Sequence, residues 1–174
     1  MKTMKRNALR VTRLLDQFLD IRKIDKVQLK LNRRRTDLVS HIGSSLSGFE
    51  YLAKKRNIRI EFRHVMDRMD FSIDPNHLDT IIYNLMSNAL KFTPDKGEIT
   101  VTLALDSNDG SAEICVMDTG TGIDEKEGKK LFQRFYQGKN SESNNIKGFG
   151  IGLNLCQMLV QMHGGTISAS NRTD

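Results

Sequence analysis

The 174-residue sequence predicts an α/β domain preceded by a bundle-type helix. Two kinds of segment alternate along residues 36–174: some repeat apolar residues at helical spacing, and others alternate apolar and polar residues as half-buried strands do. The first 26 residues instead carry one continuous apolar seam. With 38% hydrophobic and 28% charged residues, the composition is that of a globular protein rather than a disordered one.

The N-terminal seam consists of Met4, Ala8, Val11, Leu15 and Phe18, which step by four, three, four and three residues. This spacing is typical of a coiled coil or a helical bundle. Because a single helix cannot bury its own seam, we expect a partner helix, and a homodimer of the intact protein is the simplest source.

The net charge of +6 is concentrated at the N-terminus, where residues 1–35 hold 12 Lys and Arg against three Asp. We interpret residues 30–35 as a basic linker, so that residues 1–35 precede a main domain of residues 36–174. No aromatic residues interleave with the basic ones and no nucleic-acid-reading motif is present, so we expect no direct nucleic-acid partner. Attraction to a membrane surface is the weaker alternative.

No apolar run approaches the roughly 20 residues that cross a bilayer, and the N-terminus lacks the apolar core of a signal peptide. We therefore expect this part of the protein in the cytoplasm, without membrane contact. Cys115 and Cys156 lack the CxxC or Cys/His spacing of a zinc site, which predicts two reduced packing residues.

The first half of the main domain is predicted as helix, strand, strand and helix. Residues 37–57 form the first helix, with Asp37 near its start, and residues 58–62 and 71–73 form short strands. Asp74 then supplies an N-cap and Pro75 the first helical position of the second helix, which runs to Phe92.

The second half is predicted to open with a hairpin of residues 98–105 and 112–117, joined by a turn at 107–110. A helix from Asp124 should end at Phe132, Phe135 and Tyr136, which we interpret as core anchors. The polar residues 137–147 predict a mobile loop. A helix over 153–162 follows and stops at His163, and residues 166–170 form the last predicted strand.

Polar side chains form a stripe on the helix that ends at Phe92. Asn84, Asn88 and Lys91 stand at i, i+4 and i+7, so they share one face. Carboxamide oxygens suit magnesium, and a lysine one turn on suits phosphate. The alternative is a core helix whose amides bond to neighbouring backbone, and the segment alone leaves both interpretations open.

Two glycine-bearing segments follow. Asp118 ends a predicted strand and precedes Gly120 and Gly122, and an ionised carboxylate there can accept a hydrogen bond from the amino group of adenine. The alternative is an ordinary Asp/Gly turn. Residues 148–153 place three glycines before a helix N-terminus, which is an anion site. Because this turn does not follow a strand, a dinucleotide fingerprint is disfavoured.

Taken in order, these segments resemble the ATP-binding catalytic domain of two-component sensor histidine kinases, within the GHKL ATPase superfamily. The matching segments are the N box at 84–94, the G1 box at 118–123, the F box at 132–136 and the G2 box at 148–153. Residues 1–26 resemble the second helix of the dimerisation and phosphotransfer hairpin. The resemblance implies a two-layer α/β sandwich, in which helices cover one face of a mixed sheet, preceded by a bundle helix.

The resemblance implies ATP and magnesium as cofactors, with Asn88 as principal metal ligand, Asn84 beside it, Lys91 on phosphate and Asp118 on adenine. Residues 137–149 would cover the nucleotide. Gln137 stands where many relatives have an arginine. The positively charged side chain that contacts the γ-phosphate would therefore be Arg134, Lys139 or Lys147. The full set of implied nucleotide-binding residues is Asn84, Asn88, Lys91, Phe92, Asp118, Gly120, Gly122, Ile123, Tyr136, Lys147, Gly148, Phe149, Gly150, Gly152 and Leu153.

The implied reaction transfers the γ-phosphoryl group of ATP to a histidine on an upstream hairpin helix, and then to an aspartate of a response-regulator receiver domain. None of His41, His64, His77 and His163 has the acceptor's sequence setting, so this chain alone should not autophosphorylate. The resemblance further implies a parent protein anchored in the inner membrane, with a hybrid sensor as one form of it. The family's final GxGT segment and strand are expected to be missing after residue 170.

Two alternatives remain. A serine kinase of the anti-sigma-factor type shares the N, G1 and G2 boxes, but the N-terminal seam and the F box disfavour it. A degenerate module that uses ATP only as a signal is disfavoured by the intact Asn88 and Asp118. Gyrase-like ATPases would need a glutamate in the helix, whereas position 84 is an amide, so no base is present there to activate water.

Overall fold

The computed structural model describes residues 31–124, 128–137 and 150–171. All of these residues except Leu31 belong to one compact unit, Asn32–Asp174. The predicted seam over residues 4–18 and most of the predicted loop lie outside the described residues. The elements of this unit are β1 (Arg34–Asp37), α2 (Leu38–Ser47), α3 (Glu50–Lys55), β2 (Arg59–His64), β3 (Asp70–Ile73), α4 (Pro75–Phe92), β4 (Glu98–Leu105), β5 (Ala112–Asp118), η1 (Gly128–Lys130) and α6 (Gly152–Met162).

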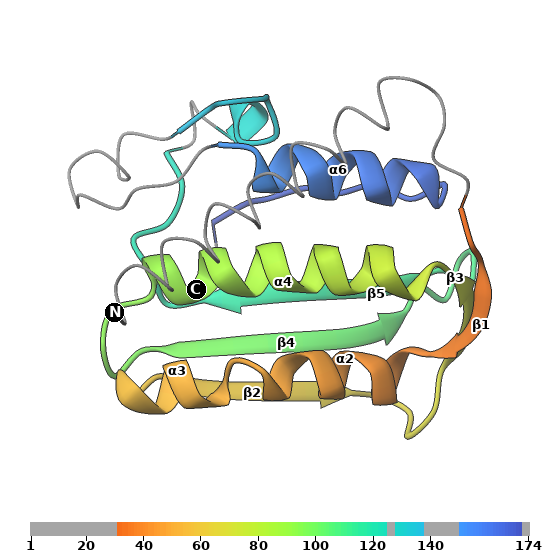
Figure 1. The fold of residues 1–174 in the computed structure, drawn as a ribbon, viewed down its shortest axis with the longest axis horizontal. Coiled ribbons are helices and arrows are strands. Elements are labelled where there is room, and N and C mark those ends of the chain that lie inside the picture. The colour runs from red at the N-terminus through yellow and green to blue at the C-terminus, as the bar shows by residue number, and fades with distance from the viewer. Residues whose placement is uncertain (1–30, 125–127, 138–149, 172–174) are drawn as a thin grey trace, which may run out of the picture. The chain divides into compact units, whose positions relative to one another are not determined.

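The main sheet is mixed, with strand order β2-β4-β5 among the described residues. β2 runs parallel to β4, and β4 pairs antiparallel with β5. Helices α2, α3, α4 and α6 lie in one layer over one face of this sheet (Figure 1). The predicted two-layer α/β sandwich is therefore confirmed.

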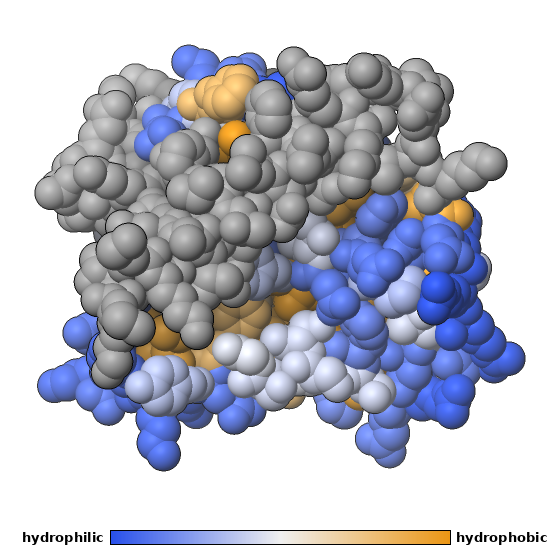
Figure 2. Space-filling model, viewed as in Figure 1, coloured by the Kyte–Doolittle hydropathy of each residue, from blue (hydrophilic) through white to orange (hydrophobic). Residues whose placement is uncertain are grey.

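The core lies between the helix layer and the sheet. Its fully buried side chains include one from α2, two from α4 and three from β4: Ile42, Ile82, Met86, Ile99, Val101 and Leu103. Where residues of uncertain placement do not cover it, this face is mostly polar, with apolar residues visible in the hollow between the lower helices and the rest of the layer (Figure 2). The amphipathic spacing of the sequence thus places each element by burying one face.

Helix α4 begins and ends where the sequence predicts. The Asp74 carboxylate accepts hydrogen bonds from the backbone N–H groups of Asn76 (3.0 Å) and His77 (3.4 Å), and Pro75 is the first helical residue. The predicted hairpin is also confirmed, since β4 and β5 are joined by a turn in which Asp106 N donates to Ser111 O at 2.8 Å.

The helix predicted over residues 37–57 is instead two helices, α2 and α3. The chain turns at Gly48, and Phe49 N donates to Leu46 O at 2.9 Å. Glycine and serine are weak helix formers, and the Ser44 and Ser47 hydroxyls both bond to helix carbonyls, which competes with the regular ladder. The break follows from this composition.

Two further local predictions were wrong. Arg34 and Arg35, expected in a linker, belong to β1, because β1 pairs antiparallel with β3. Where a helix from Asp124 to Tyr136 was expected, the described residues form only the short 3-10 turn η1 and further turns. Phe132 is buried, but Phe135 has a φ of 63° and is 67% exposed, so it is not a core anchor.

The last predicted strand, residues 166–170, pairs with no strand in the described part of the chain. It runs as an extended, mostly exposed segment back from the end of α6 (Figure 1). A β-strand requires backbone hydrogen bonds to a neighbouring strand, and the alternation of side chains in a sequence does not show whether such a neighbour exists.

Candidate functional site

The polar stripe of α4 faces the start of α6. Asn84 is 7% exposed, and its Nδ2 donates to Thr80 O at 2.8 Å. Its Oδ1 faces Gly152, where an added Cβ would lie only 2.7 Å from that oxygen. The close packing of α4 and α6 therefore fixes the Asn84 amide and requires glycine at position 152.

Asn88, Lys91 and Phe92 lie further along α4 and are each half-buried. The Lys91 ammonium sits 4.7 Å from the centre of the Phe92 ring. Within the described residues, the Asn88 amide makes no hydrogen bond, so its oxygen can accept an external ligand. A half-buried amide oxygen of this kind fits a magnesium ligand.

The loop after β5 lies against the end of α4. Asp118 is half-buried at the end of the strand, and its Oδ1 accepts a hydrogen bond from Gly120 N at 2.8 Å. An added Cβ at Gly120 would lie 2.8 Å from Phe92 O. The G1 and N boxes, which the sequence separates by about 30 residues, are therefore in direct contact.

The far end of this loop is held by Asn171. Its Oδ1 accepts from Ile123 N at 2.7 Å, and its Nδ2 donates to Ile123 O at 2.6 Å. The same Oδ1 would lie 2.9 Å from a Cβ at Gly122, whose φ is 69°. One amide thus satisfies both backbone groups of Ile123, as a neighbouring strand would.

The F and G2 boxes meet at Gly150. Phe135 N donates to Gly150 O at 2.8 Å. Gly150 has a φ of 65°, and an added Cβ would lie 2.5 Å from backbone atoms of Phe135 and Tyr136. The three predicted site residues at 147–149 lie outside the described residues.

The N-terminus of α6 lies on the same side of the molecule as the C-terminus of α4 (Figure 1). The N-cap position, Ile151, provides no side-chain hydrogen bond to the first turn. Among the described residues, the N-cap side chain thus leaves the first backbone N–H groups of α6, near Gly152 and Leu153, able to bind an anion.

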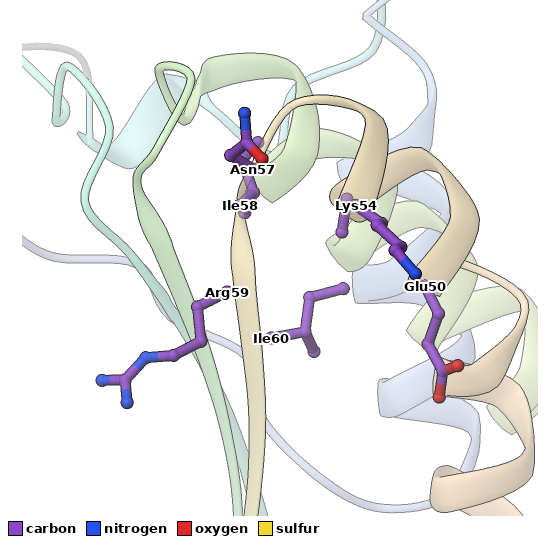
Figure 3. Close-up of a pocket in the computed structure, with 7 residues that line it drawn as sticks. Glu50, Lys54, Asn57, Ile58, Arg59 and Ile60 are labelled. Carbon is purple, nitrogen blue, oxygen red and sulfur yellow. The ribbon is translucent and has the colours of Figure 1, made fainter.

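No other metal or ligand site competes for this role in the described residues. They contain no group of three or more His, Cys, Asp or Glu side chains that could hold a metal ion. A separate open cavity of about 510 Å³ lies between α3 and β2, lined by Glu50, Lys54 and Arg59 among others (Figure 3). Since none of the predicted site residues lines it, the candidate site remains the junction of α4, α6 and the loop after β5.

The four histidines have structural surroundings. His64 Nδ1 lies 2.9 Å from Met66 O. His163 Nε2 accepts from Asp74 N at 3.1 Å, and its Nδ1 lies 2.7 Å from Leu159 O, which fixes the Nδ1–H tautomer. His77 stacks edge-on against His163, with ring centres 5.6 Å apart. His41 pairs with Asp79 at 2.9 Å.

Sequence reasoning missed two residues next to the site. One asparagine in a polar stretch, such as Asn171, carries no spacing signal. Arg56, whose guanidinium contacts the end of α4, lies in a segment whose periodicity predicts only a helix. Both act through side-chain bonds to distant backbone, which neither motif nor periodicity encodes.

Similar proteins were found by family, sequence and structure. Residues 73–174 match the family described as histidine kinase-, DNA gyrase B-, and HSP90-like ATPase. Sensor histidine kinase TmoS of Ectopseudomonas mendocina is 34% identical over 170 residues, which are 98% of this chain and 17% of TmoS. The chain therefore spans about a sixth of the length of that relative.

Two solved structures share the fold. The mycobacterial sensor histidine kinase MprB is 27% identical, with a TM-score of 0.62 over 76% of this chain and 80% of that one. The catalytic domain of histidine kinase ThkA is 24% identical, with a TM-score of 0.72 over 82% and 89%.

No helix in the described part of the chain is long and apolar enough to cross a membrane.

The family match covers more than half of the chain, and it includes the N, G1, F and G2 boxes whose contacts are described above. The resemblance to a histidine-kinase ATP-binding domain is thereby confirmed, and the chain belongs to the histidine kinase-, DNA gyrase B-, and HSP90-like ATPase family.

Proposed function

We propose that this chain is the ATP-binding catalytic domain of a two-component sensor histidine kinase. The observation that carries the proposal is the meeting of three boxes along the C-terminal half of α4: Gly120 lies against Phe92, and Gly152 lies against Asn84. The F box joins through the Phe135–Gly150 hydrogen bond. Backbone donors, amide oxygens and a lysine are thus gathered on this half of the helix.

In this proposal, Asn88 binds magnesium through its amide oxygen, with Asn84 one turn before it. Lys91 and the N-terminus of α6 contact phosphate, and Asp118 binds the adenine amino group. When bound, magnesium neutralises phosphate charge during transfer. The remaining proposed contacts with the nucleotide are Phe92, Gly120, Gly122, Ile123, Tyr136, Lys147, Gly148, Phe149, Gly150, Gly152 and Leu153.

The proposed acceptor is a histidine on a phosphotransfer helix of the intact protein, because the histidines of this chain occupy structural settings. His163 is held by Asp74 and Leu159, and His41 by Asp79. Phosphoryl transfer depends mainly on positioning and charge stabilisation, so a docked acceptor helix would complete the site.

The proposed next partner is a response-regulator receiver domain, and the intact protein is proposed to be a homodimer. A solved complex of histidine kinase ThkA with the response regulator TrrA has the same fold, with a TM-score of 0.71 at 21% identity. It covers 93% of this chain and 45% of that one.

Calorimetric titration of the 174-residue chain with ATP, with and without magnesium, tests the site. Asn88→Ala should weaken Mg-ATP binding about tenfold, or ~1.4 kcal/mol, with little effect on metal-free ATP. Asp118→Asn should reduce the preference for ATP over GTP. Asn76→Ala, at the exposed start of the same helix, and Asp67→Asn, in an exposed loop, are matched controls.

Equal loss of Mg-ATP and metal-free ATP affinity in Asn88→Ala would contradict the metal role. Unchanged discrimination between ATP and GTP in Asp118→Asn would contradict the adenine role. A wild-type chain that binds no adenine nucleotide would refute the proposed function as a whole.

A further inference from the structure

Arg56, the residue after α3, forms hydrogen bonds at the C-terminal end of α4 with all three guanidinium nitrogens. Nη1 donates to Leu90 O, and Nη2 donates to Thr93 O at 2.7 Å. Nε donates to Asp95 Oδ1 at 2.8 Å. One side chain from the helix α3 region therefore binds three points within six residues of the α4 terminus.

These bonds satisfy backbone carbonyl groups that the helix itself leaves without a hydrogen-bond donor. The last carbonyls of an α-helix have no partner within it and carry the negative end of its dipole. In α4, Thr93 N and Thr93 Oγ1 both donate to Ala89 O, which leaves Leu90 O and Thr93 O to Arg56. Leu90 and Thr93 are 8% and 1% exposed, so water is a poor substitute for the guanidinium.

The turn that Arg56 caps is the one that carries the candidate site. Lys91 and Phe92 lie between the two carbonyls that it binds, and Asn88 lies in the same turn. Phe92 O is also the atom against which Gly120 packs. Fraying of this turn would therefore disturb the N box and its contact with the loop after β5 together.

We propose that Arg56 is a positioning residue of the nucleotide site: by capping the C-terminus of α4 it holds Asn88, Lys91 and Phe92 in their binding arrangement. This inference rests on the proposed function. Arg56 touches no nucleotide itself, because its nitrogens are engaged with Leu90, Thr93 and Asp95.

The ion pair with Asp95 is the minor part of the clamp. The Asp95 side chain is 71% exposed, and exposed pairs of this kind contribute little. Asp95→Asn should therefore bind Mg-ATP as the wild type does, whereas Arg56→Gln, which cannot serve both carbonyls with a charged fork, should not. Arg56→Lys keeps the charge but not the fork and should be intermediate.

The first measurement is amide hydrogen exchange without nucleotide. Arg56→Gln should speed exchange in a peptide covering residues 84–93, with no change in one covering α6. Arg59→Gln is the matched control, because Arg59 is 68% exposed and pairs with Glu98 rather than with any α4 carbonyl. Faster exchange everywhere would mean a general loss of stability, and unchanged exchange would mean no cap; either result overturns the inference.

The second measurement is Mg-ATP affinity by calorimetry at a temperature where every variant is folded. If the capped turn is populated only about a tenth of the time in Arg56→Gln, the apparent Kd rises about tenfold. Faster exchange at 84–93 with an unchanged Kd overturns the positioning role. Failure of the wild type to bind Mg-ATP refutes the proposed function instead, while the exchange result still reports whether Arg56 caps α4.

Discussion

At the scale of single residues, the site depends on side chains that fit around backbone. Gly120 and Gly152 allow the loop after β5 and helix α6 to approach α4 more closely than any Cβ would permit. Asn171 works in the opposite way, because its amide adds the hydrogen bonds that a neighbouring strand would supply to Ile123. The loop after β5 is thus shaped at one end by the lack of a side chain at Gly120 and at the other end by the amide of Asn171.

Asn171→Ala should loosen the loop between Asp118 and Ile123 and weaken ATP binding. Two hydrogen bonds of about 1 kcal/mol each are lost, about 2 kcal/mol together, so we expect a Kd up to about 30-fold higher. Calorimetry measures the affinity, and exchange of the Ile123 amide measures the loop directly.

Ser170→Ala is the control for Asn171→Ala, since it changes the neighbouring exposed residue without touching Ile123. Asn171→Asp should restore little, because a carboxylate keeps the bond from Ile123 N but cannot donate to Ile123 O. Slow exchange of the Ile123 amide in Asn171→Ala would contradict the role assigned to this residue.

At the scale of elements, α4 is fastened at both ends by residues outside it. Asp74 caps its N-terminus, and the same carboxylate accepts from Asn32 N at 2.9 Å. Asp74 N in turn donates to His163, the residue that follows α6. The start of α4 is therefore joined both to the chain before β1 and to the end of α6.

The stabilisation from Asp74 should depend on pH. Burial acts to raise the pKa of this carboxyl, but the N–H of Asn32, the His77 ring and the first-turn N–H groups outweigh it, so the pKa falls below 3.8. A lowered pKa means that the charged form stabilises the fold above the unfolded-state pKa, and that this contribution disappears as pH falls through the lower folded-state pKa.

Urea unfolding at several pH values measures this effect. At pH 7 the wild type should exceed Asp74→Asn by about 1 kcal/mol, the usual scale of a charged N-cap. The gap should close as the pH falls below about 4. Asp67→Asn, in an exposed loop, should show no comparable gap, and a gap for Asp74→Asn that stays constant down to pH 2 would contradict the assignment.

The elements that the sequence predicts well are those whose signals are local. The Asp74–Pro75 start of α4 and the turn between β4 and β5 lie within a few residues of the structure that they set. The pairing of β1 with β3 and the break at Gly48 depend on distant partners or on competing serine bonds. Periodicity does not report either one.

At the scale of the whole molecule, the sequence predicts the boxes of the proposed site but not how they are held. The boxes can be recognised because residue types recur at fixed spacing, and two of them, at Gly120 and at Gly152, do pack against α4. The side chains of Arg56 and Asn171 instead form hydrogen bonds with backbone groups that are distant in the sequence. Such supports become visible only once the chain is folded.

The coupling between α6 and the rest of the fold can be followed through Cys156. This side chain is fully buried between α6 and α4, where its Sγ lies 3.8 Å from Ile81 O. Desolvation raises the pKa of the Cys156 thiol to about 12, so near pH 8 it is protonated as well as inaccessible. Cys115 on β5 is only half-buried.

In a Cys115→Ser variant, Cys156 should react with a thiol reagent at pH 8 only after α6 separates from α4. Because the proposed phosphate site needs α6 in place, Mg-ATP at 100 times its Kd should slow labelling about 100-fold. The Asn88→Ala variant should lose most of this protection at the same nucleotide concentration. Labelling as fast as in an unfolded peptide, or equally fast with and without Mg-ATP, would show that α6 docking and nucleotide binding are not coupled.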